Sequence, residues 1–182
     1  MHVEIVSLTE ENLIDAPEWG EHPFSCKYCI YWEFPEECVD PSRESRERML
    51  AKKLSWLRSV RNLFGDCGKI MYVDGKPVGY AQYASPKTLP LSAEYSSGPP
   101  SGDAVLISCL FIAHKEYRGR GLGKQLLQSI IEDLRKRGVK AIETFARRNN
   151  PDNPSGPVEF YLKNGFRIFR DDSEFPLMRL EL

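Results

Sequence analysis

The sequence predicts an α/β (α+β) fold, in which helices pack against a sheet of mixed strand direction. Helical patterns with one apolar face cover residues 41–64 and 122–138, and short apolar runs lie before, between and after them. The run at 105–113 is apolar almost without interruption, which is typical of a strand buried on both faces. Asp74-Gly75 separates two further runs and indicates a tight hairpin turn. Strands and helices in this order form a layered domain.

Length and composition are those of a globular domain. The chain has 182 residues, of which 41% are hydrophobic and 28% charged, so we expect a single domain over residues 1–182. A net charge of −1 argues against nucleic acid or a membrane surface as a partner. No apolar run approaches the ~20 residues of a membrane span, and the N-terminus has no signal-peptide pattern. We therefore expect a cytoplasmic protein.

The N-terminal part is expected to form one strand and an irregular insert. Residues 2–8 alternate weakly between apolar and polar side chains, as a half-buried strand does. Thr9 and the residues after it predict a short helix or turn. Residues 17–40 are rich in aromatic rings, cysteines and prolines. We expect this insert to pack its rings on the domain while its backbone stays irregular.

A long helix and a hairpin are predicted to follow the insert. Asp40 is a suitable N-cap for this helix, Pro41 suits its first position, and Gly65 is a natural stop. Apolar runs at 69–73 and 77–84 flank the Asp-Gly turn and predict the two strands of the hairpin.

The second half of the chain is predicted to alternate strands and helices. A loop at 85–102 holds four prolines, and long ordered loops inside compact domains tend to be functional. The helix after the buried strand closes at Gly138. The remaining expected elements are a strand at 139–146, a polar loop at 147–156, a short helix at 157–164, and a terminal hairpin of 166–169 with 177–182.

The stretch between the buried strand and its helix has the composition of a phosphate-binding loop. It consists of Arg118, Gly119, Arg120, Gly121, Leu122, Gly123 and Lys124. Glycine lets backbone N–H groups approach a ligand closely, and the helix start adds unpaired N–H groups and a partial positive charge. The surroundings are basic, because residues 115–140 hold eight Lys or Arg against three acids. These features predict a site for a phosphate or pyrophosphate.

Two common nucleotide-binding motifs do not fit this loop. A dinucleotide fingerprint, G-x-G-x-x-G, needs a third glycine where Lys124 stands. The phosphate loop of NTPases, G-x-x-x-x-G-K-[ST], needs glycine where Arg118 stands and a hydroxyl where Gln125 stands. Both motifs therefore fail at residues that their mechanisms require.

The spacing Arg-x-x-Gly-x-Gly, at Arg118, Gly121 and Gly123, resembles the acyl-CoA-binding loop of the GNAT superfamily of N-acyltransferases. Lys115 stands where this family usually has proline. The order of the predicted elements also resembles that of the family over essentially the whole chain, apart from the insert at 17–40. The resemblance implies a GNAT-like mixed, mostly antiparallel sheet of six to seven strands flanked by helices, with acetyl-CoA as co-substrate.

The resemblance also implies which residues hold CoA. It assigns the loop residues 118–124 to the cofactor. In this family the strand before the loop splays from its neighbour, so the backbone of Phe111, Ile112 and Ala113 is expected to pair with the pantetheine arm like an added strand. Family members often have an asparagine after the next strand that holds CoA or water. Asn149, Asn150 and Asn153 follow this strand here, in a loop that is longer than is usual in the family, and we choose Asn153 because it is nearest to the Tyr161 helix.

A second stretch, Tyr161-x-x-x-Gly165-Phe166, resembles the family's last helix and the strand that follows it. In the family a tyrosine at this position often lies beside the thioester sulfur and protonates the leaving thiolate. A phenol can stabilise a developing thiolate and deliver a proton, so Tyr161 is our candidate acid. The alternative is a buried tyrosine with one satisfied hydroxyl.

The attacking amine must lose a proton, and a carboxylate usually accepts it. Glu143 is the first candidate for this base, because it lies in the otherwise apolar run of residues 141–145, where a charge is costly unless it is used or faces water. The family often has a glutamate on this strand. A solvent-facing residue is the alternative, and Glu33 in the insert is a second candidate.

The five cysteines are an odd number, so a disulfide framework is not expected. His22, Cys26, Cys29 and Cys38 have the ligand types of a zinc site, but the second pair is poorly spaced for one. We favour buried free thiols and assign no metal. Zinc and a redox pair stay open as alternatives.

The acceptor is expected to bind between the insert and the loop at 85–102, because the family builds its acceptor pocket from these parts of the chain. Their aromatic and acidic residues suit a primary amine, carried by a small molecule, a peptide or a protein. The predicted function is direct transfer of an acetyl group from acetyl-CoA to this amine, by a monomer or homodimer. The alternative is a non-catalytic acyl-CoA-binding sensor or protein-interaction module.

Overall fold

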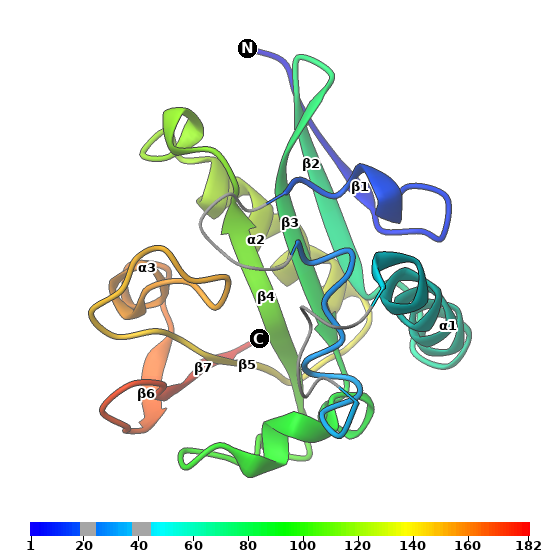
Figure 1. Ribbon diagram of the computed structural model, residues 1–182. Helices are drawn as coiled ribbons and strands as arrows, with labels where there is room; N and C mark the ends of the chain where they lie inside the picture. The colour runs from blue at the N-terminus through cyan, green and yellow to red at the C-terminus, as the bar shows by residue number, and fades with distance from the viewer. Residues whose placement is uncertain (19–24, 38–44) are drawn as a thin grey trace.

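The computed structural model describes residues 1–18, 25–37 and 45–182. Within them one sheet has the strand order β1-β2-β3-β4-β5-β7-β6 (Figure 1). Its neighbouring strands are antiparallel, except for the parallel pair β4 and β5. The strands are β1 Val3–Ser7, β2 Gly68–Val73, β3 Lys76–Ala84, β4 Ala104–Ile112, β5 Ala141–Phe145, β6 Arg167–Arg170 and β7 Leu177–Glu181. The predicted mixed, mostly antiparallel sheet is confirmed.

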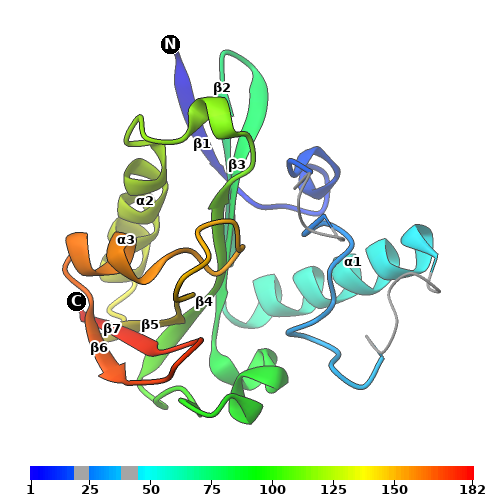
Figure 2. The same ribbon diagram turned by 60° about the vertical axis from the view of Figure 1, so that its left-hand side comes forward.

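Helices cover both faces of this sheet, as Figure 2 shows. The described part of the insert and α1 (Arg46–Leu63) lie on one face, and α2 (Leu122–Lys136) with α3 (Val158–Lys163) lies on the other. Every residue of β4 is buried, because its side chains alternate between the two cores. The predicted strand with two buried faces is therefore confirmed. None of the described helices is long and apolar enough to cross a membrane.

Strands β4 and β5 pair over only part of their length. The pairing runs from Ala104 with Ala141 to Ile107 with Thr144 and then stops. One residue later, at Ser108, β4 has a bulge against β3, because Cys109 lies opposite Gln82 while Ile107 lies opposite Tyr83. The second half of β4 therefore turns one backbone edge away from β5.

The helix after the insert begins later in the structure than the sequence predicts. The predicted cap Asp40 and first residue Pro41 lie outside the described residues. The described helix α1 starts at Arg46, and the hydroxyl of Ser45 caps it by accepting a hydrogen bond from the Arg48 amide at 3.2 Å. Ser45 suits this position because its side chain reaches an amide of the first turn that has no partner inside the helix.

The described part of the insert packs its rings on the domain, as predicted. The Trp32 ring stacks on Phe145 of β5, with 6.0 Å between ring centroids. It also meets Tyr95, from the loop at 85–102, edge to face at 5.1 Å. The Trp32 carbonyl accepts a hydrogen bond from the Leu91 amide at 3.3 Å. The insert and the long loop are thus joined over one face of the sheet.

We expect Gly68→Ala to destabilise the protein, because no room exists for a Cβ at this position of β2. An added Cβ would lie 2.6 Å from the Leu8 side chain and 2.8 Å from the Ala81 carbonyl oxygen. Forced overpacking of this kind costs about 1–3 kcal/mol. Urea unfolding should show a lower midpoint than that of Gly102→Ala, where nothing lies within 4 Å. Equal midpoints for the two variants would contradict the packing described for β2.

Candidate active site

A cavity of about 530 Å³ lies between the end of β4, the start of α2 and helix α3. Two predicted cofactor-binding residues do not line it. Ala113 is buried, with its amide bonded to the Val78 carbonyl at 2.8 Å, and Arg120 is exposed outside the cavity. The predicted residues that do line it are Phe111, Ile112, Arg118, Gly119, Gly121, Leu122, Gly123, Lys124 and Asn153.

The glycine loop has the backbone geometry of an anion site. Gly119 and Gly121 have φ angles of 73° and 79°, in the left-handed region that favours glycine. Gly121 is the N-cap of α2, and no side chain caps this helix. Its first amides therefore face the cavity side without an intrahelical acceptor, next to Lys124. This arrangement suits a phosphate or pyrophosphate.

Arg118 connects the end of β4 with the loop at 147–157. Its Nε donates to the Ile112 carbonyl at 3.1 Å, and its Nη1 forms an ion pair with the Asp152 carboxylate. Asp152 was not among the residues predicted from the sequence. No motif marks it, because only folding of the loop brings its carboxylate to Arg118.

The same loop also occupies the free edge of β4. The Leu110 amide donates to the Pro154 carbonyl at 2.9 Å, so a backbone group beyond the β4–β5 pairing is bonded to the loop. The side chain of Asn153 shapes the loop, because its Oδ1 accepts from the Ser155 amide at 2.9 Å. A cavity with an anion-binding end and a strand edge beside it can hold a long ligand that carries phosphate at one end.

Comparison with known proteins identifies the family. The model of the acetyltransferase (GNAT) family matches residues 26–166. The chain belongs to the GNAT family. Proteins of this family use acetyl-CoA as co-substrate. The Arg-x-x-Gly-x-Gly loop and the Tyr161 motif both lie inside the matched range.

Similar proteins agree with this assignment. An uncharacterised N-acetyltransferase of Methanocaldococcus jannaschii is 30% identical over 94 residues, which are 52% of this chain and 36% of that protein. The chain thus matches about a third of the length of this relative. Among solved structures, the PaiA N-acetyltransferase of Thermoplasma acidophilum in complex with coenzyme A has a TM-score of 0.62 at 19% identity, with 100% of both chains covered. The ribosomal-protein-alanine N-acetyltransferase of Brucella melitensis has a TM-score of 0.59 at 20% identity, covering 98% of this chain and 99% of that one.

Tyr161 lies behind the residues that line the cavity and is not one of them. Its hydroxyl donates to the Ser155 carbonyl at 2.9 Å, and its side chain is fully buried on α3. The backbone of Gly156, which lines the cavity, packs against it: a Cβ there would lie 3.2 Å from the hydroxyl. Burial raises the pKa of Tyr161, so the phenol keeps its proton.

Glu143 is buried, so the alternative of a solvent-facing acid is wrong. The structure does not bring it to the cavity either, because it lies opposite Leu106, in the paired part of β4 and β5. Its carboxylate accepts from the Ser101 amide at 2.6 Å and hydroxyl at 2.9 Å, and lies 3.4 Å from Arg179. These contacts account for both oxygens of this buried acid.

The described cysteines are free thiols. Burial raises the pKa of Cys29 to about 12, and Cys26, Cys67 and Cys109 are buried as well. Within the described residues, no group of three His, Cys, Asp or Glu side chains could hold a metal ion. His22 and Cys38, which the zinc interpretation requires, lie outside these residues.

Replacing Glu143 by Gln should lower the free energy of unfolding. The variant should leave the cavity unchanged, because Glu143 does not line it. Arg179 keeps its ion pairs with Asp103 and Glu181, but a buried amide at this position puts an NH2 donor where a carboxylate oxygen accepts a hydrogen bond, which costs about 1–3 kcal/mol. Chemical unfolding should show this loss. The control is Glu174→Gln, which removes an exposed pair with Arg147 and should cost less than about 1 kcal/mol. Unchanged stability of Glu143→Gln would contradict a structural role for this carboxylate.

Proposed function

We propose that the protein is an acetyl-CoA-dependent N-acetyltransferase that moves the acetyl group to a primary amine by direct attack. The observation that carries this proposal is the uncapped start of α2 beside the free edge of β4, in a chain of the GNAT family. One end of this arrangement suits the phosphates of CoA, and the other suits an extended chain with amide groups. The PaiA structure, which has the same fold, contains coenzyme A.

The residues present fit acetyl-CoA in three respects. The first amides of α2 and the side chains of Arg118 and Lys124 hold the pyrophosphate. The unpaired backbone edge of β4 at Leu110 and Ile112 lies along the cavity, where the pantetheine amides would pair with it. This edge begins beyond Ile107, and it would bring the acetyl end of the donor to the point where β4 and β5 separate.

In the transfer, the amine nitrogen attacks the acetyl carbonyl carbon, an N–C bond forms, the nitrogen gives up one proton to a base, and the C–S bond to CoA breaks. The leaving thiolate takes a proton, and we assign this proton to Tyr161. The Ser155 carbonyl accepts from that hydroxyl in the free protein, and the Pro154 carbonyl of the same loop accepts from the Leu110 amide. A pantetheine arm on β4 competes for the Leu110 amide, so donor binding moves the loop and frees the phenol.

A non-catalytic acyl-CoA-binding module is the second candidate. The packing of Trp32 favours it, because this ring fills space between the insert and β5 where an acceptor would have to enter. The two functions differ in one measurement, since a binding module takes up acetyl-CoA without releasing CoA when an amine is supplied.

Acetyl-CoA turnover over a panel of small amines and peptide N-termini should separate the two candidates. We expect CoA release with at least one amine. Tyr161→Phe should then lower kcat by a factor of about 10²–10³, with little change in CoA affinity, because a general acid acts in the chemical step. Tyr83→Phe is the matched control, since it is a buried tyrosine bonded to Asp133 away from the cavity. Equal kcat for both variants would remove Tyr161 from the mechanism.

CoA affinity should respond in opposite directions to two substitutions. Arg118→Ala should weaken binding about tenfold or more, because a charge-assisted contact to phosphate is lost. Asp152→Asn should tighten binding about two- to fivefold, because the carboxylate that pairs with Arg118 no longer competes with phosphate. Isothermal titration calorimetry at fixed salt measures both effects. Weaker binding by Asp152→Asn would show that Asp152 supports the site instead.

A further inference from the structure

The described part of the insert carries one fully buried carboxylate, that of Glu33, on the face of the sheet that it covers. Its side chain has 0% exposure, and that of Lys53 on α1 has 3%. Oε1 of Glu33 accepts from the Lys53 ammonium and from Gln82 Nε2, the latter at 2.8 Å. Oε2 is buried and has no hydrogen-bond partner in the described part of the chain. One carboxylate oxygen is thus fixed and the other is left for an N–H donor.

The unpartnered oxygen is costly for the folded protein. A buried acceptor without a hydrogen bond costs about 1–3 kcal/mol, and a charged one costs more. Lys53 does not remove this cost, because it binds the other oxygen. Burial opposes the charge of Lys53, but Glu33, Cys29 and Cys109 outweigh burial and raise the pKa of Lys53. The site is therefore a buried ion pair with one acceptor position open.

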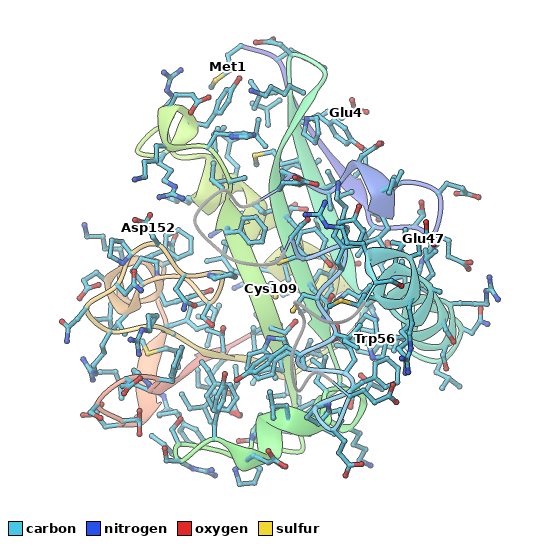
Figure 3. All side chains as sticks on the ribbon, viewed as in Figure 1. Met1, Glu4, Glu47, Trp56, Cys109 and Asp152 are labelled. Atoms are coloured by element: carbon cyan, nitrogen blue, oxygen red, sulfur yellow. The ribbon has the colours of Figure 1, made fainter. Side chains whose placement is uncertain are left out.

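Glu33 lies near the point in β4 where the pairing with β5 ends. Gln82 links it to β4, since Gln82 Nε2 also donates to the Ser108 hydroxyl at 3.1 Å. Ser108 is the bulged residue, directly after the last residue that pairs with β5, and Leu110 lines the donor cavity. Cys109, which Figure 3 labels, follows Ser108 in β4 and packs in the same core as Cys26 and Trp32 of the insert. The donor cavity and Glu33 thus lie on opposite faces of the unpaired part of β4.

We propose that Glu33 is the acceptor-side catalytic residue, whose Oε2 receives the proton of the attacking primary amine. This inference rests on the proposed acetyl transfer. As the N–C bond forms, one N–H proton passes from nitrogen to Oε2, the C–S bond breaks, and CoA leaves as a thiolate that is protonated separately. Nitrogen becomes a stronger acid once it is bonded to the carbonyl carbon, so a carboxylate is a sufficient base at this stage. Lys53 and Gln82 hold Oε1 and so present Oε2.

The other titratable groups around Glu33 are thiols and a phenol. Burial raises the pKa of Cys29 to about 12 and raises that of Tyr80 as well. The hydrogen bond between Cys26 and Cys109 raises the pKa of Cys26 and lowers that of Cys109. Cys109 is therefore the neighbour that a pH experiment has to control.

The test is the pH dependence of kcat at saturating amine, for the wild-type protein and three variants. A base works only when deprotonated, so wild-type kcat should fall toward acidic pH. Glu33→Gln should lower kcat at least about 100-fold and abolish this acidic limb. Lys53→Met should lower kcat as well, because Oε1 of Glu33 then loses one of the two donors that hold it. Cys109→Ala should keep the limb where it is in the wild type.

A purely structural ion pair predicts something else. In that case Glu33→Gln and Lys53→Met both lower stability, and every folded variant keeps the wild-type limb, which would overturn the inference. If Glu33→Gln does not fold, Glu33→Gln/Lys53→Met decides, because uncharged residues often replace a buried ion pair without loss of stability. CoA binding by each variant shows that the donor site is intact. A wild-type protein that binds CoA but acetylates no amine overturns the proposed function, and this inference with it.

Discussion

The unpaired half of β4 is the constraint on which the rest of the structure depends. A buried strand edge must bond its N–H and C=O groups to something, and β5 serves this purpose only as far as Ile107. Beyond this point the partner of the Leu110 amide is the Pro154 carbonyl, in a loop rather than a strand. A loop can be displaced at far lower cost than a central strand, so this edge can exchange an internal partner for a ligand.

This loop connects three parts of the donor site. Asp152 pairs with Arg118, the Pro154 carbonyl accepts from the Leu110 amide of β4, and the Ser155 carbonyl accepts from Tyr161. The proposed reaction uses the Arg118 guanidinium, the Leu110 amide and the Tyr161 hydroxyl, and in the free protein the loop binds all three. A donor that binds the arginine and the strand edge competes with two of these contacts at once. Donor binding and release of the phenol are thereby coupled through one short segment.

The opposite face of β4 belongs to the insert. Its rings pack against β5 and the long loop, and Glu33 and Lys53 form their ion pair beneath them. A buried ion pair is rarely the most stable filling for a core. The proposed role of Glu33 as a proton acceptor, near the end of the β4–β5 pairing, gives a reason for these charges. Packing alone would favour apolar side chains.

The sequence by itself determined the fold class, the family and the donor loop, because these depend on local patterns. The apolar run of β4, the stripe of α2 and the spacing from Arg118 to Gly123 specify strand, helix and anion site without distant contacts. Only the tertiary structure decided the surroundings of the acids. The sequence favoured Glu143, because it lies in an apolar strand where the family often has a glutamate, and made Glu33 the second candidate. Pairing within the sheet buries Glu143 against Arg179, while the path of the insert leaves one oxygen of Glu33 without a partner among the described residues, because these contacts join segments far apart in the chain.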